Sequence, residues 1–351
     1  MTSNLYRCRI PILKINEEKV NAMQLIKVHG SENDFYMLDA TKLNRQLTED
    51  EIKQLAINIC NRKSGLGDGA DGLLWINKSE HNNVIGKMRV INSDGSEASM
   101  CGNGLRCVAR YLAETNHQQS FTVETMEADL PVAKMPSLAA GVETYQAHIA
   151  PVSFAAKDLG MHVNNEADTL IDQSIAELDT DLKFTAVAVP NPHLIAFVDE
   201  ETINGDYLGE LGRYLNNKTN PVFPDGVNVS FVRILGKNQI FVRTFERGVG
   251  YTNACGTAMS ASSLVSVLLH SDQVSNNTNI SVCNPGGMVN TVVHHSVSED
   301  DYIDLIGNAT FVRTVEINLE DALTSNFEHV TINETNEQAA YEQFIQTLQT
   351  A

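Results

Sequence analysis

Short apolar runs separated by polar or glycine-rich turns dominate this 351-residue chain. Runs of this length with turn residues on both sides are typical of β-strands. In chain order the predicted strands are residues 24–28, 35–38, 73–76, 88–91, 121–123, 145–149, 185–189, 227–232, 240–245, 280–282, 291–293 and 302–305. The pattern therefore predicts a strand-rich protein with few helices.

Helical spacing of apolar residues appears over 47–61, where Thr48 precedes Glu51 by three residues and predicts a capping box. Two further helices are predicted over 104–113 and 257–269, each inside a run of strands. Each half of the chain thus combines several strands with one central helix. The halves share negligible sequence identity, so we infer a structural repeat.

A cysteine precedes each of these central helices. The two turns read Cys101-Gly102-Asn103-Gly104 and Cys255-Gly256-Thr257. A cysteine at a glycine-flanked helix start lies beside unpaired backbone N–H groups, which favour the thiolate. One such turn could arise by chance, but one in each half suggests a pair of acid/base thiols facing a shared site.

Paired thiols suit removal of the α-proton of an amino acid. Many enzymes use pyridoxal phosphate as the electron sink for this step. The alternative is a base on each face of the carbon, a thiolate that takes the proton and a thiol that delivers one, so that the stereocentre inverts. Cysteine suits either role, because neighbouring groups can shift its pKa from the ordinary value of roughly 8.5. Backbone N–H groups at the helix starts could hold the carboxylate beside the reacting carbon.

Two further residues could adjust these thiols. The segment Pro190-Asn191-Pro192-His193 places His193 on a predicted rigid turn, as a general-base partner for one cysteine. Glu246, nine residues before Cys255, could partner the other. A lone histidine is more often structural, and Glu246 with Arg247 could be a simple ion pair. Together with both cysteine turns, the functional interpretation is the better one.

Composition excludes several functions. The formal net charge of −19 argues against nucleic-acid binding, which needs clustered Lys and Arg. Apolar runs are too short to span a membrane. The glycine-rich loop over 65–72 lacks the Gly-Lys-Ser/Thr ending of a phosphate loop, and the absence of CxxC and HExxH motifs argues against zinc.

The first 22 residues carry charges and lack the apolar region of a secretory signal, so we expect a cytoplasmic protein. Its cysteines should then be reduced. The acidic C-terminal segment has apolar residues at helical spacing over 335–348, which predicts a short amphipathic helix that packs on the surface.

Taken together, these motifs resemble the diaminopimelate epimerase family. The matching pieces are residues 29–35, 92–107, 191–193, 224–229, 246–257 and 285–287, in family order between about Met23 and about Asn318. The resemblance implies a cofactor-independent isomerase that interconverts LL- and meso-2,6-diaminopimelate, in lysine and peptidoglycan synthesis. The family binds no cofactor or metal and is usually a homodimer.

The resemblance also implies residue roles. Cys101 and Cys255 match the catalytic thiols, and His193 and Glu246 match the residues that set their protonation. The implied substrate-binding residues are Asn33, Asn92, Gly102, Asn103, Asn191, Asn228, Glu246, Arg247, Gly256 and Thr257. Asparagine offers both donors and acceptors to a distal amino-acid group, and arginine adds carboxylate recognition.

The fold implied is of the α/β (α+β) class, with two similar domains. In each, a strongly curved, mainly antiparallel sheet wraps around a central helix, and the active site lies in the cleft between them. We expect an N-terminal extension at 1–22, a first domain at 23–147 plus 308–320, a second at 148–307, and an acidic tail at 321–351.

The chain departs from the family pattern in its loops. Tyr251 stands where the family usually has glutamate, Ala258 where it usually has glycine, and Asp68 where an aliphatic residue is usual. Gly72 stands where some members have a substrate-contacting glutamine. These changes bear on substrate preference more than on reaction type. The alternatives are a related cofactor-independent racemase, such as one acting on histidine, a binding protein that kept the pocket, and a thiol-redox role for the two cysteines.

Overall fold

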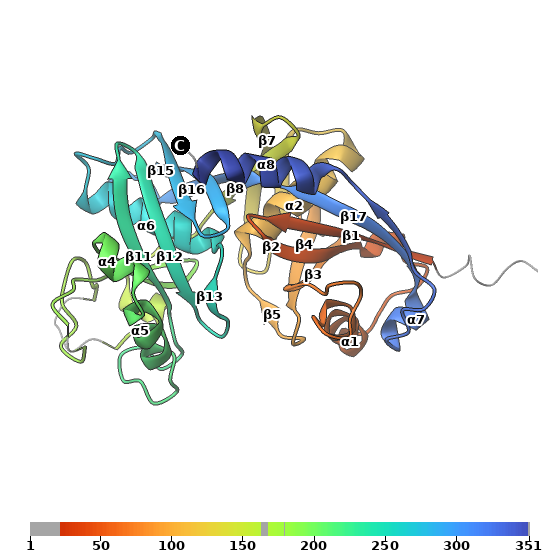
Figure 1. Ribbon diagram of the computed structural model, residues 1–351, viewed down its shortest axis with the longest axis horizontal. Helices are drawn as coiled ribbons and strands as arrows, with labels where there is room; N and C mark the ends of the chain where they lie inside the picture. The colour runs from red at the N-terminus through yellow and green to blue at the C-terminus, as the bar shows by residue number, and fades with distance from the viewer. Residues whose placement is uncertain (1–21, 163–167, 179, 350–351) are drawn as a thin grey trace, which may run out of the picture.

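The computed structural model describes residues 22–162, 168–178 and 180–349, which form two bodies of similar construction side by side (Figure 1). Both bodies are mixed α/β, as the sequence predicts. The first contains β1 (Ala22–Gly30), β2 (Asn33–Asp39), β3 (Gly72–Asn77), β4 (Val84–Asn92), β5 (Glu97–Ala98), β6 (Ser120–Glu124), β7 (Asp129–Ala139), β8 (Val142–Ile149), β17 (Thr310–Asn318) and β18 (Thr331–Glu334). The second contains β9 (Thr185–Val189), β10 (Asn191–Phe197), β11 (Asn228–Gly236), β12 (Gln239–Glu246), β13 (Gly250–Thr252), β14 (Asn279–Asn284), β15 (Gly287–His294) and β16 (Tyr302–Asn308).

The helices lie on and between these sheets. They are η2 (Ala40–Lys42), α1 (Glu49–Cys60), α2 (Gly102–Asn116), α3 (Ala156–Leu159), α4 (Glu200–Asn204), α5 (Tyr207–Leu215), α6 (Gly256–Leu269), α7 (Leu319–Leu323) and α8 (Glu337–Gln349). Every strand and helix that the sequence predicts overlaps an observed element. The sequence prediction missed the strands β5, β7, β10, β13, β17 and β18, and the short helices η2, α3, α4, α5 and α7.

The strand pairing repeats in the two bodies. In the first, β2 pairs parallel with β3, β3 antiparallel with β4, and β4 parallel with β6. In the second, β10, β11, β12 and β14 repeat this series. An antiparallel pairing of β8 with β16 joins the halves, and across the described residues the strands form one 18-stranded sheet. The predicted structural repeat is therefore confirmed.

One central helix fills each curved sheet, α2 in the first body and α6 in the second. Both helices belong to one large apolar cluster. α6 is rich in buried serine, and three of its hydroxyls donate to backbone carbonyls four residues earlier, as Ser260 does to Gly256 at 2.9 Å. These bonds satisfy hydroxyl groups that would otherwise be buried without a partner.

Shorter helices cover the outer faces. α1 and α7 pack on the first sheet and α5 on the second. α1 begins with the predicted capping box, in which the Thr48 side chain accepts from the Glu51 backbone and the Glu51 side chain accepts from that of Thr48. Among the described residues, no helix is both long and apolar enough to cross a membrane.

The C-terminal helix α8 lies across both bodies (Figure 1). It contacts β8 and β17 of the first and β15 of the second. Glu337 pairs with Arg110 of α2 at 2.5 Å, and the Tyr341 hydroxyl donates to the Gly286 carbonyl at 2.8 Å. The predicted amphipathic helix is confirmed, and Tyr341, on its inner face, is almost fully buried.

The segment around His193 is not the turn that the sequence predicts. Pro190 alone separates β9 from β10, and Asn191 already pairs with Val189. His193 therefore lies inside β10, opposite Asn228 of the parallel strand β11. The prediction was wrong because two prolines were taken to mark a turn, whereas pairing with strands on both sides keeps the chain extended.

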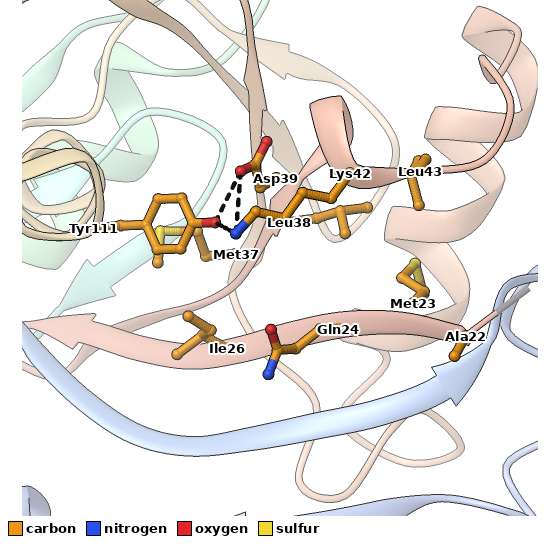
Figure 2. A pocket seen from close by; sticks show the side chains of 10 residues that line it. All are labelled: Ala22, Met23, Gln24, Ile26, Met37, Leu38, Asp39, Lys42, Leu43 and Tyr111. Atoms are coloured by element: carbon orange, nitrogen blue, oxygen red, sulfur yellow. Dashed lines mark hydrogen bonds and ion pairs between the residues drawn. The ribbon is translucent and has the colours of Figure 1, made fainter. Parts of the chain in front are cut away.

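A small pocket lies between β1, β2 and the side of α2 (Figure 2). In it, Asp39 accepts a hydrogen bond from Tyr111 at 2.8 Å and pairs with Lys42 at 3.6 Å. None of the site residues predicted from the sequence lines this pocket.

Candidate active site

The N-termini of α2 and α6 meet where the two bodies join. A β-carbon on Gly102 would lie 3.9 Å from the Gly256 Cα, and one on either glycine would collide with Leu305. The side-chain amide of Asn103 donates to the Ala254 carbonyl at 3.4 Å, so the two cysteine turns are also bonded to each other. The two helix N-termini therefore lie next to each other, and their combined positive ends suit a carboxylate.

Cys101 is the N-cap residue of α2. Its sulfur accepts from the Gly104 N–H at 3.3 Å, and its thiol faces Asn33 Oδ1 at 3.5 Å. Burial raises the pKa of the Cys101 thiol to about 11, although the Gly104 bond opposes that rise. The sequence argument for a thiolate at the helix start is therefore outweighed by burial, and the thiol form dominates at neutral pH.

Cys255 holds the equivalent position at the start of α6 and is 8% exposed. Its sulfur lies 3.5 Å from Thr257 Oγ1. Burial, followed by the nearby charge of Glu246, raises the pKa of the Cys255 thiol well above its ordinary value. The two cysteines therefore occupy matching positions in the repeat, and both are held protonated.

Glu246 ends β12 beside Cys255. Burial raises the pKa of its carboxyl group, while hydrogen bonds with Thr252 and Cys255 oppose the change. The charge of Glu246 also raises the pKa of Cys101. The charge of Glu246 therefore acts on both thiols. The sequence predicts it as a partner for only one of them.

His193 is fully buried. Its Nε2 lies 3.1 Å from Asn191 Oδ1, and its Nδ1 has no partner among the described residues. Burial, with a contribution from the Arg247 charge, lowers the pKa of His193 to about 3, so the imidazole is neutral. Within the described part of the chain it makes no hydrogen bond to either thiol, so its predicted role as a general-base partner stays a prediction.

A cleft with a volume of about 890 Å³ opens beside Cys101, and both bodies line it. The predicted site residues on its wall are Asn33, Asn92, Cys101, Glu246 and Arg247. The others do not line the open cleft: Gly102, Asn103, Asn191, His193, Asn228, Cys255, Gly256 and Thr257. Asn228 adjoins it by accepting from the Arg247 backbone N–H at 2.8 Å.

Comparison with known proteins identifies the family. The sequence model described as diaminopimelate epimerase matches residues 25–135 and 185–312.

This chain belongs to the diaminopimelate epimerase family.

Curated relatives agree with that assignment over most of the chain. A diaminopimelate epimerase of Lactiplantibacillus plantarum is 60% identical over 93% of this chain and 99% of its own length. One from Enterococcus faecalis is 57% identical over 92% of this chain and 97% of its own. Membership of this family makes the chain an isomerase.

Solved structures share the fold at low sequence identity. A Bacillus anthracis phenazine biosynthesis protein of the PhzF family matches with a TM-score of 0.58 and 18% identity, over 84% of this chain and 99% of its own. A hydroxyproline epimerase from Agrobacterium vitis matches with a TM-score of 0.55 and 14% identity, over 85% and 91%. The predicted fold class is thereby confirmed.

The departures of this family member lie at different distances from the cleft. Tyr251 lines the cleft, with its ring 4.7 Å from the Arg243 guanidinium. Asp68 does not line it and instead pairs with Lys27 and Arg313 at 3.7 and 3.5 Å. Asp68 therefore lies in the same loop as the cleft-wall residue Asp71, but its own side chain is outside the cleft wall.

Sequence reasoning missed four charged residues on the cleft wall, Glu32, Arg62, Asp71 and Asp94. A signal was available: Asp71 immediately precedes β3, and Asn33 begins β2. Neighbouring parallel strands that start at one edge bring the residues at their starts together. Asn33 indeed donates to Asp71 at 2.7 Å.

Proposed function

We propose that this chain interconverts LL- and meso-2,6-diaminopimelate without pyridoxal phosphate. The observation that carries the proposal is the meeting of two cysteine-capped helix N-termini beside the cleft. The 60% identity to a diaminopimelate epimerase supports the choice of substrate.

In the proposed reaction, the substrate carboxylate next to the reacting carbon accepts from the N–H groups of the Gly102-Asn103 and Gly256-Thr257 turns. These N–H groups stabilise the charge that develops when the α-proton leaves. One of Cys101 and Cys255 removes the proton as a thiolate, and the other delivers a proton to the opposite face as a thiol. The configuration inverts, and the two cysteines exchange protonation states.

Because both thiols have raised pKa values, the thiolate has to be generated when the substrate binds. Burial disfavours a negative sulfur in the cleft, and Glu246 adds to that penalty. A substrate ammonium group entering beside them supplies the compensating positive charge. Proton removal from a thiol is thus coupled to substrate binding, which limits the exposure of a reactive thiolate.

The distal end of the substrate carries a second amino-acid group. Arg247 and Asn92 line the cleft and suit its carboxylate and ammonium. Asn228 holds the Arg247 backbone from behind. A histidine side chain carries no second carboxylate, so this wall favours the diamino acid over histidine.

The proposal includes the finer expectations drawn from the sequence. These are a homodimer, a cytoplasmic location, a place in lysine and peptidoglycan synthesis, and domain bounds at 23–147 plus 308–320 and at 148–307. His193 is included as a neutral group that helps set thiol protonation.

The test is proton NMR of reduced protein in D2O with no added cofactor, offering LL-diaminopimelate and, separately, L-histidine. Loss of the α-proton signal from diaminopimelate alone is the expected result. Exchange of histidine alone would keep the two-thiol mechanism and overturn the substrate. Exchange of neither would overturn the proposed activity.

A further inference from the structure

A line of polar contacts runs from the exposed cleft wall to the Cys101 thiol. Asn33 lies in the middle of it. Its Nδ2 donates to Asp71 Oδ2 at 2.7 Å, and its Oδ1 lies 3.5 Å from Cys101 Sγ and accepts from Asn103 Nδ2 at 3.2 Å.

Asp71 and Asn103 favour the same orientation of the Asn33 amide, and Asp71 makes the shorter of the two hydrogen bonds. An ionised carboxylate can only accept hydrogen bonds, so the amide must present its NH2 group to Asp71 and its oxygen to Cys101. An oxygen acceptor beside a sulfur favours the S–H form, which can donate to it, over the thiolate, which it repels. The orientation of Asn33 thus bears on the protonation of Cys101.

Asp71 is itself anchored. Arg62 Nη2 lies 2.7 Å from Asp71 Oδ1 and 2.5 Å from Asp34 Oδ1, so the arginine bridges two carboxylates. Asp34 also pairs with the buried Lys27 at 2.6 Å, and its backbone N–H donates to Asp71 at 3.2 Å. Burial would raise the pKa of Asp34, but Arg62 and Lys27 lower it, so it stays ionised.

We propose that Asp71, anchored by Arg62, is a positioning residue that fixes the Asn33 amide with its oxygen toward Cys101 and so keeps that cysteine in the thiol form. The catalytic importance of this role rests on the proposed function, because a two-base reaction needs one cysteine protonated. Its test measures the thiol directly and needs no substrate.

The variants leave the other groups that face Cys101 in place, although the charge of Asp71 also raises the pKa of Glu246, an effect that does not pass through Asn33. These groups are Glu246 from β12, Arg106 and Cys107 on the same helix, and Cys255 from α6. The matched control is Asp68→Asn, which removes the same charge from the same loop. The Asp68 side chain pairs with Lys27 and Arg313 and does not line the cleft, and the bond from Arg62 to the Asp68 backbone carbonyl does not depend on that charge.

The experiment measures the pH dependence of Cys101 alkylation by iodoacetamide, read from the Cys101 peptide by mass spectrometry. In Asp71→Asn the side chain presents either oxygen or NH2 to Asn33, so only the bond from Asn103 still favours the original orientation. The amide can then turn and donate to the thiolate. We expect alkylation below the thiol pKa to accelerate about tenfold, the ratio for one pKa unit. The alkylation rate of Asp68→Asn should stay near that of the wild type. Asp71→Glu keeps the carboxylate and should therefore be almost as slow as the wild type.

A through-space charge effect would give the same sign for Asp71→Asn, so two further variants separate the explanations. In an Asn33→Ala background, Asp71→Asn should have no further effect. Arg62→Gln removes a positive charge, which by charge alone would slow alkylation; loss of the anchor should instead accelerate it.

An undiminished effect of Asp71→Asn without Asn33, or slower alkylation in Arg62→Gln, would overturn the proposal. So would a wild-type rate in Asp71→Asn. Failure of the epimerase assay with wild-type protein would leave all these alkylation results unchanged, so the two proposals fail separately. If both hold, the pH profile of kcat/KM in Asp71→Asn should move with the thiol pKa, which a merely structural role would not cause.

Discussion

The side-chain amide of Asn103 donates a hydrogen bond to the carbonyl oxygen of Ala254, 3.4 Å away. Asn103 is the second residue of α2, and Ala254 directly precedes Cys255. The two turns that carry the thiols are therefore bonded across the join between the bodies. The same amide group also donates to Asn33, so one side chain holds three parts of the site in register.

This arrangement predicts unequal effects of two substitutions. Asn103→Ala removes the bonds, at a cost of about 1 to 3 kcal/mol, or roughly five- to 150-fold in kcat/KM. Asn103→Asp should cost more, because a carboxylate would face the Ala254 and Asn33 oxygens. The measurement is the steady-state kcat/KM of epimerisation for Asn103→Ala and for Asn103→Asp. Equal activity of the Asp variant and the wild type would show that this link does not align the thiols.

The thiols themselves give the plainest prediction. Cys101→Ala and Cys255→Ala should each abolish turnover, a loss of at least about 10³-fold, because each removes one of two required bases. The measurement is α-proton exchange in D2O, with thermal unfolding to verify the fold. Cys283→Ala is the control, since Cys283 lies in β14 away from the cleft lining. Near wild-type turnover in either single-thiol variant would refute the two-base mechanism.

Local features of this fold could be read from the sequence. The capping box at Thr48, the cysteine turns and the apolar face of α8 each depend on residues within a few positions of one another. Helix caps and strand periodicity are short-range effects, so a pattern of residue types is enough to predict them.

Long-range contacts could not be read in the same way. The antiparallel pairing of β8 with β16 joins segments more than 150 residues apart, and no local pattern specifies it. His193 was misplaced because local proline spacing was weighed without the strands on either side. The thiolate expected at each helix start was outweighed by burial, which depends on the packing of the whole site.

The buried imidazole of His193 predicts a pH dependence of stability. Folding lowers its pKa from 6.5 to about 3, so between these values the unfolded chain binds the proton and the folded chain does not. The free energy of unfolding should therefore fall as the pH falls through this window, by up to about 1.4 kcal/mol per pH unit from this group. Above it the group contributes no pH dependence. His29, with its pKa lowered by burial to about 4, adds a similar effect over a narrower range.

Urea unfolding at several pH values measures this slope. His193→Gln should flatten it between about pH 6 and pH 4, whatever the variant does to stability at pH 8. His162→Gln, at an exposed position, should keep the wild-type slope. An unchanged slope in His193→Gln would mean that the imidazole is not buried in its neutral form.

The C-terminal helix α8 should stabilise the whole molecule, because it packs on both bodies. Tyr341 is 1% exposed, touches the His29 ring edge-on at 4.7 Å, and donates to the Gly286 carbonyl in the turn between β14 and β15. Tyr341→Ala removes a buried ring and should lower the free energy of unfolding by about 3 to 5 kcal/mol. Tyr341→Phe removes only the hydrogen bond and should cost about 1 kcal/mol.

Activity separates stability from positioning in the same variants. Gly286 donates its N–H to the Asn253 carbonyl, two residues before Cys255, so the Tyr341 hydroxyl bond reaches the second cysteine turn through one residue. Tyr341→Phe should therefore lower kcat severalfold at a temperature where it is fully folded. Gln343→Ala, on the exposed side of α8, should change neither stability nor rate. Full kcat in Tyr341→Phe, together with the expected loss of stability, would mean that this hydrogen bond only stabilises the fold, because the turn at Gly286 would then hold its place without it.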